Sequence, residues 1–196
     1  MANIRNQCSW VHSHDWDTAT AKAKDLVRMA VARAVLLEPQ HTIDVPVQRA
    51  ALVVGGGAAG MTAALSLAGQ GFPVHLVERD DALGGNLRRV FTPYNGQDPQ
   101  AILRHLVAKV RAEPRITVHL RSRVVAVSGF TGNFRSVLED AGGARIEVLH
   151  GATVLATGGQ EYRGPEYGYG ADPRILTQQE FEARLASGDS LPASVV

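Results

Sequence analysis

The feature that most constrains how this chain folds is a glycine-rich turn that follows a short apolar run. Residues 51–54 (ALVV) have the composition of a strand that is buried on both faces of a sheet. Residues 58–68, which follow the turn, are rich in alanine and predict a helix. Three glycines stand at G-x-G-x-x-G spacing, namely Gly55, Gly57 and Gly60. This order of elements is the first half of a dinucleotide-binding βαβ unit.

A second β-type run completes that unit and ends on an acid. Residues 74–77 (VHLV) predict the second strand, and Glu78 follows it directly. In a dinucleotide-binding unit, the acid about 20 residues beyond the glycines accepts hydrogen bonds from ribose hydroxyls. A carboxylate there also repels a 2′-phosphate, which disfavours NADP, although the neighbouring Arg79 weakens that exclusion. Arg79 is expected either to lie along the adenine or to point into solvent.

The glycine turn also predicts where a pyrophosphate binds. Gly55 allows a sharp turn out of the strand, Gly57 lets the backbone lie against the pyrophosphate, and Gly60 lets the helix pack closely on the strand. The helix N-terminus adds unpaired N–H groups and the positive end of its dipole. We therefore expect a pyrophosphate site formed by Gly55, Gly57, Ala58, Ala59 and Gly60. A glycine-rich turn in an α/β protein that binds no nucleotide is the alternative.

The composition excludes several classes of protein. With 45% hydrophobic and 20% charged residues, the chain resembles a globular domain, and its net charge of +1 gives no reason to expect nucleic acid or an anionic membrane as a partner. Neither a membrane-spanning run nor the apolar core of a signal peptide is found, so we expect a cytoplasmic protein. Because Cys8 is the only cysteine, this chain cannot form an internal disulfide, a CxxC pair or a four-cysteine iron–sulfur cluster.

Before the glycine turn, the sequence predicts one long helix. Residues 18–38 are rich in alanine and leucine, with Asp17 or Thr18 as the N-cap and Pro39 as the stop. The basic residues of this helix favour a solvated face over an interface with a partner. The expected parts of the chain are an N-terminal extension with this helix and a linker (1–48, irregular over 1–17), an FAD/NAD(P)-binding domain (49–170), and a C-terminal helix with the truncated start of a further element (171–196).

After the βαβ unit, the apolar periodicity changes from that of a helix to that of strands. Residues 99–112 predict an amphipathic helix, with Asp98 as its cap. From Ile116 onward the period is two, which predicts strands at 116–120, 124–127, 134–138, 145–149 and 153–156. We expect a small antiparallel meander inserted before a last parallel strand at 153–156. A short helix at 177–186, capped by Thr177, is expected to follow.

Three features together resemble a family of flavoproteins with two dinucleotide-binding domains, which includes thioredoxin-reductase-like enzymes. They are the E-R-x-x-x-L-G-G pattern at 78–85, the meander, and V-L-A-T-G-G at 154–159. The resemblance implies an α/β, Rossmann-like parallel sheet with a small antiparallel meander, preceded by a helical N-terminal extension. It also implies that the βαβ unit holds the ADP part of FAD.

A narrower resemblance extends along nearly the whole chain, to the A-type subunits of heterodisulfide reductases. It is carried by several separate segments in the same order, NIRNQCSWVH (3–12), ATAKAKDLVRMAVARA (19–34), ALVVGGGAAGMTAAL (51–65), LGGNLR (83–88), GNF (132–134), ATGGQEYR (156–163) and LTQQEFEARL (176–185). Members of that family are FAD- and iron–sulfur-containing subunits of anaerobic electron-transfer complexes. The resemblance implies redox partner subunits or domains, with the iron–sulfur clusters outside this chain.

The chain also departs from this family. Its members are much longer and carry cysteine-rich ferredoxin-type motifs and a further redox domain, none of which is present in this sequence. The late G-D motif that contacts FAD is absent, and the chain stops at 193–196, where such proteins start the next strand. We therefore expect a fragment, an excised domain or a truncated product, which is not active alone.

Further cofactor contacts are expected beyond the βαβ unit. Gly84 and Gly85 form a second close-approach turn, and Asn86 and Arg88 are expected to donate to phosphate or ribityl oxygens, with a surface arginine as the alternative for Arg88. By analogy with the fold, the backbone of the strand at Arg123 and Val124 is expected to pair with the adenine edge, although a core role for this valine is simpler. The end of the last parallel strand is expected to approach the diphosphate or ribityl, through Ala156, Thr157 and Gly158, with a plain strand-to-loop turn as the alternative.

The sequence supplies no catalytic acid–base or nucleophile set, as expected where a flavin carries the chemistry. Cys8, His12 and His14 form a Cys-x3-His-x-His pattern, but no second cysteine completes a metal site, so a buried or idle cysteine is favoured and no metal is expected. We predict an FAD-binding module of a heterodisulfide reductase A-like oxidoreductase that relays electrons between flavin and iron–sulfur partners. An NAD(H)-binding module and a cofactor-free interaction domain are the alternatives.

Overall fold

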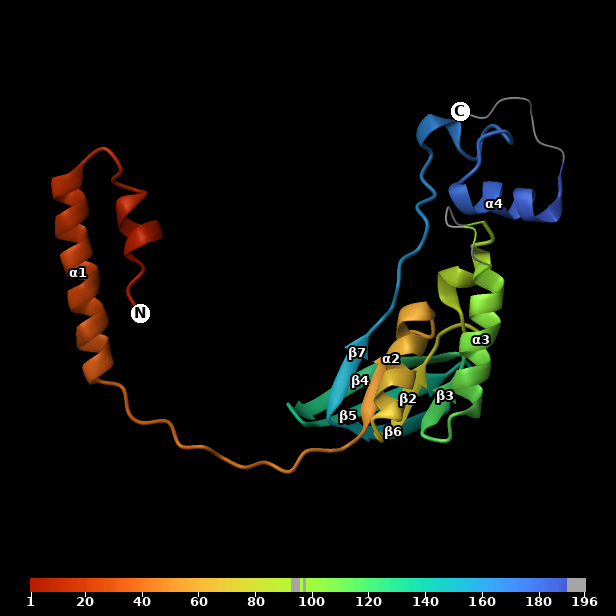
Figure 1. The fold of residues 1–196 in the computed structure, drawn as a ribbon, viewed down its shortest axis with the longest axis horizontal. Coiled ribbons are helices and arrows are strands. Elements are labelled where there is room, and N and C mark those ends of the chain that lie inside the picture. The colour runs from red at the N-terminus through yellow and green to blue at the C-terminus, as the bar shows by residue number, and fades with distance from the viewer. Residues whose placement is uncertain (93–95, 97, 190–196) are drawn as a thin grey trace. The chain divides into compact units, whose positions relative to one another are not determined.

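A computed structural model describes residues 1–92, 96 and 98–189 of the chain (Figure 1). The chain forms two compact units, Met1–Asp44 and Val45–Val196. The expected start of a further element at 193–196 lies outside the described residues.

The first unit contains one long helix and one short helical segment. They are α1 (Trp16–Val35) and the π-type turn η1 (Arg5–Ser9). The expected cap of the long helix was wrong, because the Asp15 carboxylate accepts a hydrogen bond from the Thr18 N–H at 3.0 Å and the helix begins at residue 16. The prediction that residues 1–17 are irregular was also wrong at η1, where the Trp10 N–H donates to the Arg5 carbonyl at 3.0 Å.

In its described residues, the second unit contains two sheets and three α-helices. Its strands are β1 (Ala51–Val54), β2 (Val74–Val77), β3 (Ile116–His119), β4 (Ser122–Phe130), β5 (Asn133–Asp140), β6 (Arg145–His150) and β7 (Ala152–Leu155). Its helices are α2 (Ala58–Gly69), α3 (Pro99–Ala112) and α4 (Gln178–Ser187), with short 3-10 turns η2 (Gly85–Arg89) and η3 (Glu166–Gly168). The parallel sheet has the order β3-β2-β1-β7, and β4-β5-β6 form the antiparallel sheet. The predicted fold class is confirmed.

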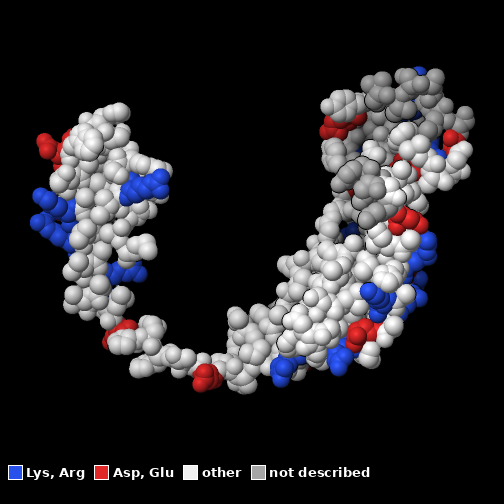
Figure 2. All heavy atoms as spheres, in the orientation of Figure 1, with Lys and Arg blue, Asp and Glu red and all other residues white. Residues whose placement is uncertain are grey.

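Helices α2 and α3 cover one face of the parallel sheet (Figure 1). Alternate residues of the parallel strands, such as Val53 and Leu76, are fully buried there against Met61 of α2 and Val110 of α3. The opposite side of α3 is charged, and Figure 2 shows blue side chains along the part of the second unit where this helix runs. Burial of this one apolar side therefore explains why the amphipathic pattern forms a helix here, as predicted.

The antiparallel sheet covers the other face of the parallel sheet. The intervening residues of β1 and β2, Leu52 and Val77, are buried in one cluster with Leu138 of β5 and Val148 of β6. This arrangement differs from the sequence expectation at β3, which was assigned to the meander. The strand pairs in parallel with β2, with Ile116 opposite Val74, and so belongs to the nucleotide-binding sheet.

The helix ends follow the capping residues found in the sequence. Asp98 accepts from two backbone N–H groups of α3, at 2.8 and 3.0 Å, and confirms its predicted role. Thr177 caps α4 in a reciprocal box with Glu180, which confirms the second predicted cap. Within the described ranges, none of the helices combines the length and apolar character needed to cross a membrane.

Candidate cofactor-binding site

A cavity of about 950 Å³ opens at the carboxyl ends of β1, β2 and β7. Parallel strands end at the same edge of a sheet, and the loops that leave them form a crevice there. All the residues predicted to bind the cofactor line this cavity except Gly60. The volume lies in the range usual for small-molecule sites.

The glycines of the turn have different environments. A Cβ on Gly55, whose φ is +109°, would collide with the Ala156 carbonyl oxygen, and one on Gly60 would collide with the Gly55 carbonyl oxygen. These two positions therefore allow backbone to pass close to backbone. A Cβ on Gly57 would meet no atom within 4 Å, because it would project into the open cavity. The turn thus leaves room for a ligand at one glycine and uses the other two for packing.

The N-terminus of α2 faces this open space. Gly57 is the N-cap, and among the described residues no side chain caps the helix there. The first N–H groups of an α-helix have no carbonyl partner within the helix, and they carry the positive end of its dipole. Because Ala58 and Ala59 line the cavity, their N–H groups are placed to bind an oxyanion such as a phosphate.

Glu78 lies at the end of β2 with its carboxylate fixed by the backbone. It is only 6% exposed, and its Oε2 accepts from the Gly56 N–H at 2.7 Å while its Oε1 accepts from the Asp80 N–H at 2.9 Å. Each carboxylate oxygen retains a further lone pair, so this group can still accept hydrogen bonds from ligand hydroxyls in the cavity. Its orientation is therefore set before any ligand binds.

A second glycine turn lies against the first. Gly84 (φ +126°) and Gly85 (φ +50°) adopt conformations that favour glycine, and the Gly84 N–H donates to the Gly56 carbonyl at 2.8 Å. Asn86 then joins two walls of the cavity, since its Nδ2 donates to the Gly159 carbonyl at 3.1 Å, in the loop that follows β7. The cavity is thus enclosed by loops that are bonded to each other as well as to the sheet.

The charge of the cavity wall is predominantly positive. Among the described residues, the lining carboxylates are Glu78 and Asp80, and the lining arginines are Arg79, Arg88, Arg89 and Arg123. Arg88 is partly neutralised by Asp81, at 3.9 Å, but both side chains are exposed and the pair is weak. This excess of guanidinium groups favours an anionic ligand.

Several lining residues escaped the sequence analysis. Arg89, Ser122 and Gln160 line the cavity, although none was predicted to bind. Arg89 adjoins the predicted Arg88, so proximity in sequence was the available signal. Gln160 follows a glycine pair, and its position in the wall depends on how the loop after β7 folds.

The cysteine–histidine pattern of the first unit does not form a cluster. Cys8 is buried, and its Sγ–H donates to the Ala19 carbonyl at 2.7 Å. His12 instead contacts the Lys22 ammonium, with Nε2 and Nζ 3.3 Å apart. Among the residues that the structure describes, no group of three or more His, Cys, Asp or Glu side chains is arranged to hold a metal ion.

Three histidines lie outside the cavity wall and have depressed pKa values. His75 Nδ1 and His119 Nε2 are 3.1 Å apart on neighbouring strands, and their rings stack. His150 is buried, with Nε2 2.8 Å from Ser136 Oγ and Nδ1 3.1 Å from the Ala152 carbonyl oxygen. Burial lowers the pKa of each of the three, because it penalises the charged ring.

Comparison with known proteins gives the family context of this cavity. The sequence matches the profile of the family described as FAD dependent oxidoreductase over residues 51–166. The solved structure of L-proline dehydrogenase from P. horikoshii superposes on the chain with a TM-score of 0.51 at 26% identity, covering 63% of this chain and 25% of that one. Both β-sheets and the cavity fall largely within the matched residues.

Curated relatives confirm the resemblance to the A-type subunits of heterodisulfide reductases. The second A-type iron–sulfur subunit of CoB–CoM heterodisulfide reductase from Methanopyrus kandleri is 47% identical over 140 residues, which are 71% of this chain and 21% of that protein. A heterodisulfide reductase A-like protein of Archaeoglobus profundus is 45% identical over 136 residues, 69% of this chain and 19% of that protein. The chain therefore spans about a fifth of the length of these relatives.

Proposed function

The chain belongs to the FAD-dependent oxidoreductase family, and from that premise we propose that its second unit is the FAD-binding module of a heterodisulfide reductase A-like protein. The observation that carries the proposal is the open space beside Gly57, at the N-terminus of α2 and within a cavity rich in arginine. A pyrophosphate fits this position because it needs close backbone approach, N–H donors and positive charge together.

The ADP part of FAD would be held by the βαβ unit. The N–H groups of Ala58 and Ala59 would bind the pyrophosphate where Gly57 leaves room. Glu78 would accept from the adenosine ribose hydroxyls with the lone pairs that its backbone bonds leave free. Arg79 remains a candidate for the adenine, at the same end of the cavity.

The remaining lining residues would hold the rest of the cofactor. Arg88 is a forked cationic donor suited to phosphate or ribityl oxygens, and Asn86, already bonded to Gly159, would contribute through its neighbouring backbone. The backbone at Val124 would pair with the adenine edge. The strand end at Ala156, Thr157 and Gly158 would approach the diphosphate or ribityl.

The chemistry would come from the bound flavin, which accepts and returns electrons. The chain's own residues would bind and orient it and set the electrostatic environment. The arginines of the wall would favour added negative charge on the bound group. No side chain of the cavity needs to act as a catalytic acid, base or nucleophile in this proposal.

We propose that the electrons pass to or from iron–sulfur partners. A relative is named as an iron–sulfur component of heterodisulfide reductase, and the FAD-type module is the part that this chain shares with it. Cys8 is the only cysteine of the sequence, so clusters with four cysteine ligands would lie on other segments or subunits. The electron donor and acceptor would therefore be redox proteins or domains, and the cytoplasm remains the proposed compartment.

A visible absorption spectrum tests the proposed cofactor. The purified chain is measured before and after incubation with FAD and desalting, and a retained flavin band is the expected result. A parallel titration with NADH tests the nicotinamide alternative. An affinity for NADH well above that for FAD would contradict the flavin assignment, and a protein that retains neither would favour the cofactor-free alternative.

A further inference from the structure

Residues 85–92 form one segment, of which residues 85–89 line the cavity and residues 90–92 lie outside the lining. Only η2, at its start, forms a 3-10 turn, and the chain then runs without a helix or strand to Thr92. Backbone polar groups in such a segment need partners from elsewhere to hold one conformation. Two side chains, one from α3 and one from α4, supply them.

The Gln100 side chain donates hydrogen bonds to two backbone carbonyl groups of this segment. From the first turn of α3, its Nε2 donates to the Leu87 carbonyl at 3.0 Å and to the Val90 carbonyl at 2.8 Å. One side-chain nitrogen thus bridges two carbonyls of the same segment. Gln100 does not itself line the cavity. It therefore supports the wall at Leu87 from outside the cavity.

Glu182 holds the N–H groups that follow. From the middle of α4, its Oε1 accepts from the Phe91 N–H at 2.6 Å and from the Thr92 N–H at 2.9 Å. Hydrogen bonds to an ionised acceptor are about twice as strong as neutral ones. Glu182 also lies outside the cavity lining, and α4 is more than 80 residues away in sequence.

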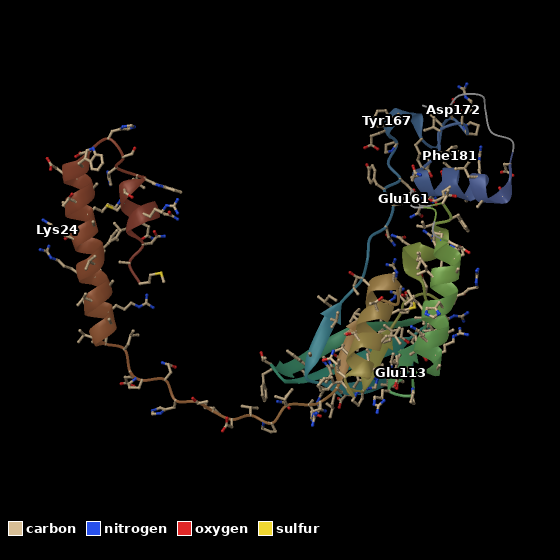
Figure 3. All side chains as sticks on the ribbon, in the orientation of Figure 1. Lys24, Glu113, Glu161, Tyr167, Asp172 and Phe181 are labelled. Carbon is tan, nitrogen blue, oxygen red and sulfur yellow. The ribbon has the colours of Figure 1, made fainter. Side chains whose placement is uncertain are left out.

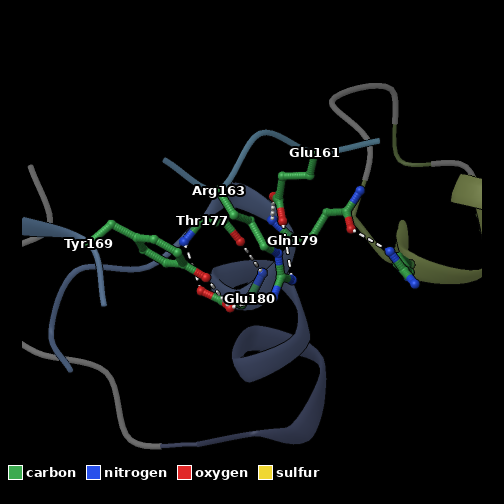
Figure 4. A network of polar contacts seen from close by, with 7 residues as sticks. Glu161, Arg163, Tyr169, Thr177, Gln179 and Glu180 are labelled. Atoms are coloured by element: carbon green, nitrogen blue, oxygen red, sulfur yellow. Dashed lines mark hydrogen bonds and ion pairs between the residues drawn. The ribbon is translucent and has the colours of Figure 1, made fainter. Parts of the chain in front are cut away.

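A third contact joins α4 to a residue that does line the cavity. Arg89 Nη1 donates to Gln179 Oε1 at 3.1 Å, and the Gln179 N–H donates to Glu161 Oε1 at 2.9 Å (Figure 4). Glu161 lies on the segment that leads from β7 to α4 (Figure 3). The wall is therefore tied to α4, and α4 is tied to the chain that leaves the opposite wall.

The helix itself is held mainly by polar contacts. Arg163 forms ion pairs with Glu161 at 3.4 Å and with Glu180 at 3.3 Å, and the Tyr169 hydroxyl donates to Glu180 at 2.8 Å. Figure 4 shows these side chains together. None of the residues of α4 is classed as buried. Its docking therefore depends on hydrogen bonds and ion pairs of specific geometry, and the loss of one of them affects the segment that it holds.

We propose that Glu182 is a positioning residue for the cofactor site, and that docking of α4 on residues 91–92 is coupled to FAD binding in the cavity. The inference rests on the proposed function, since it assigns a role toward FAD. Residues 91–92 continue directly from the wall at 85–89, so fixing them through Glu182 also restrains that wall and favours FAD binding. Coupling of two sites is reciprocal, so bound FAD in turn strengthens the contact with α4.

The test compares Glu182→Ala, Glu182→Gln and the control Ser187→Ala. Ser187 is on the same helix, and among the described residues its hydroxyl bonds the Arg184 carbonyl of its own turn. Amide hydrogen exchange of the peptide spanning 87–92 is measured without FAD, and FAD affinity and the visible spectrum of the bound flavin are measured by titration. Glu182→Ala is expected to accelerate exchange, to weaken FAD binding about tenfold and to change the spectrum.

Glu182→Gln keeps an acceptor oxygen but loses the charge, so it is expected to restore part of the protection and affinity lost in Glu182→Ala. If the Glu182→Ala variant binds FAD with the affinity of the original chain, and the bound flavin has the same visible spectrum, the proposal is overturned. If the original chain binds no FAD, the proposed function fails by itself. The hydrogen-exchange comparison without FAD then still tests whether Glu182 fixes residues 91–92. An exchange rate unchanged in Glu182→Ala would refute that role as well.

Discussion

Gly57 and Gly60 are three residues apart and have opposite relations to their surroundings. A side chain at Gly57 would enter the cavity, whereas one at Gly60 would strike the Gly55 carbonyl oxygen. Substitution at the first position should therefore affect ligand binding, and substitution at the second should affect folding. The two effects can be measured separately.

Gly57→Val is expected to abolish any rise in melting temperature that FAD produces, while leaving the melting temperature without FAD nearly unchanged. The Cβ of the valine meets no protein atom within 4 Å, and its backbone (φ −74°) is compatible with a branched side chain, but the side chain fills the place of the pyrophosphate. Gly69→Val is the matched control, because this glycine ends the same helix and also faces open space. A thermal shift with FAD that survives Gly57→Val would contradict the proposed position of the pyrophosphate.

Gly60→Ala is expected to lower the free energy of unfolding by about 1–3 kcal/mol, the usual range for overpacking. The new methyl group would overlap the Gly55 carbonyl oxygen, so α2 must move away from β1. Urea denaturation in the absence of FAD measures the effect. A decrease in the free energy of unfolding of no more than about 0.5 kcal/mol, typical of surface substitutions, would show that the helix shifts without strain.

At this scale, sequence reasoning predicted residues that line the cavity, such as Gly57 and Glu78, better than the residues that support them. The motif identified Gly57 and Glu78, because its spacing is fixed by contact with a dinucleotide. It did not identify Gly56, where a Cβ would approach Leu83 and the Glu78 carboxylate. That crowding arises from a loop that returns to the turn, and the local pattern contains no sign of it.

At the scale of elements, the histidines connect the packing of the two sheets to pH. His75 lies two residues before Val77 on β2 and therefore on the same face, toward the antiparallel sheet. Burial is the largest cause of its lowered pKa, followed by repulsion from His150, and for His119 burial is followed by repulsion from His75. In the neutral pair one ring donates to the other, and two charged rings would have no acceptor between them.

Acidification is expected to destabilise the second unit through these histidines. Their folded pKa values lie below the ordinary value of 6.5, so the unfolded chain binds more protons as the pH falls. The free energy of unfolding should therefore be highest above pH 6.5 and should decrease as the pH falls from 6.5 toward the depressed values. Urea denaturation at several pH values measures this, and His119→Gln should reduce the decrease. An unchanged decrease in that variant would exclude the pair as its source.

The elements themselves were largely predictable, and their pairing was not. Periodicity and caps placed β1, β2, α2 and α3 because these signals are local. The strand at Ile116 was correctly expected but assigned to the wrong sheet, since a period of two does not reveal which strand lies alongside. The docking of α4 through Glu182 could not be predicted either, because it depends on a contact between residues far apart in sequence.

At the scale of the whole molecule, the two units differ in how much apolar surface they bury. Apart from Cys8, all the buried hydrophobic residues of the described chain belong to the second unit. A segment of this size without a core has little hydrophobic stabilisation to offset its conformational entropy. The chain should therefore not unfold in a single two-state transition.

Cys8 provides a direct measurement of this difference, because it is the only cysteine and is buried in the first unit. Its reaction with a thiol reagent requires the first unit to open, and we expect that reaction to become fast at urea concentrations where amides of β1 and β2 are still protected from exchange. FAD should increase the protection of β1 and β2 and leave the Cys8 reaction unchanged, since ligand binding stabilises the unit that contains the site. Gly57→Val is the control that should remove the effect of FAD on the strands. Simultaneous loss of Cys8 and strand protection, with FAD delaying both, would instead show that the two units unfold together.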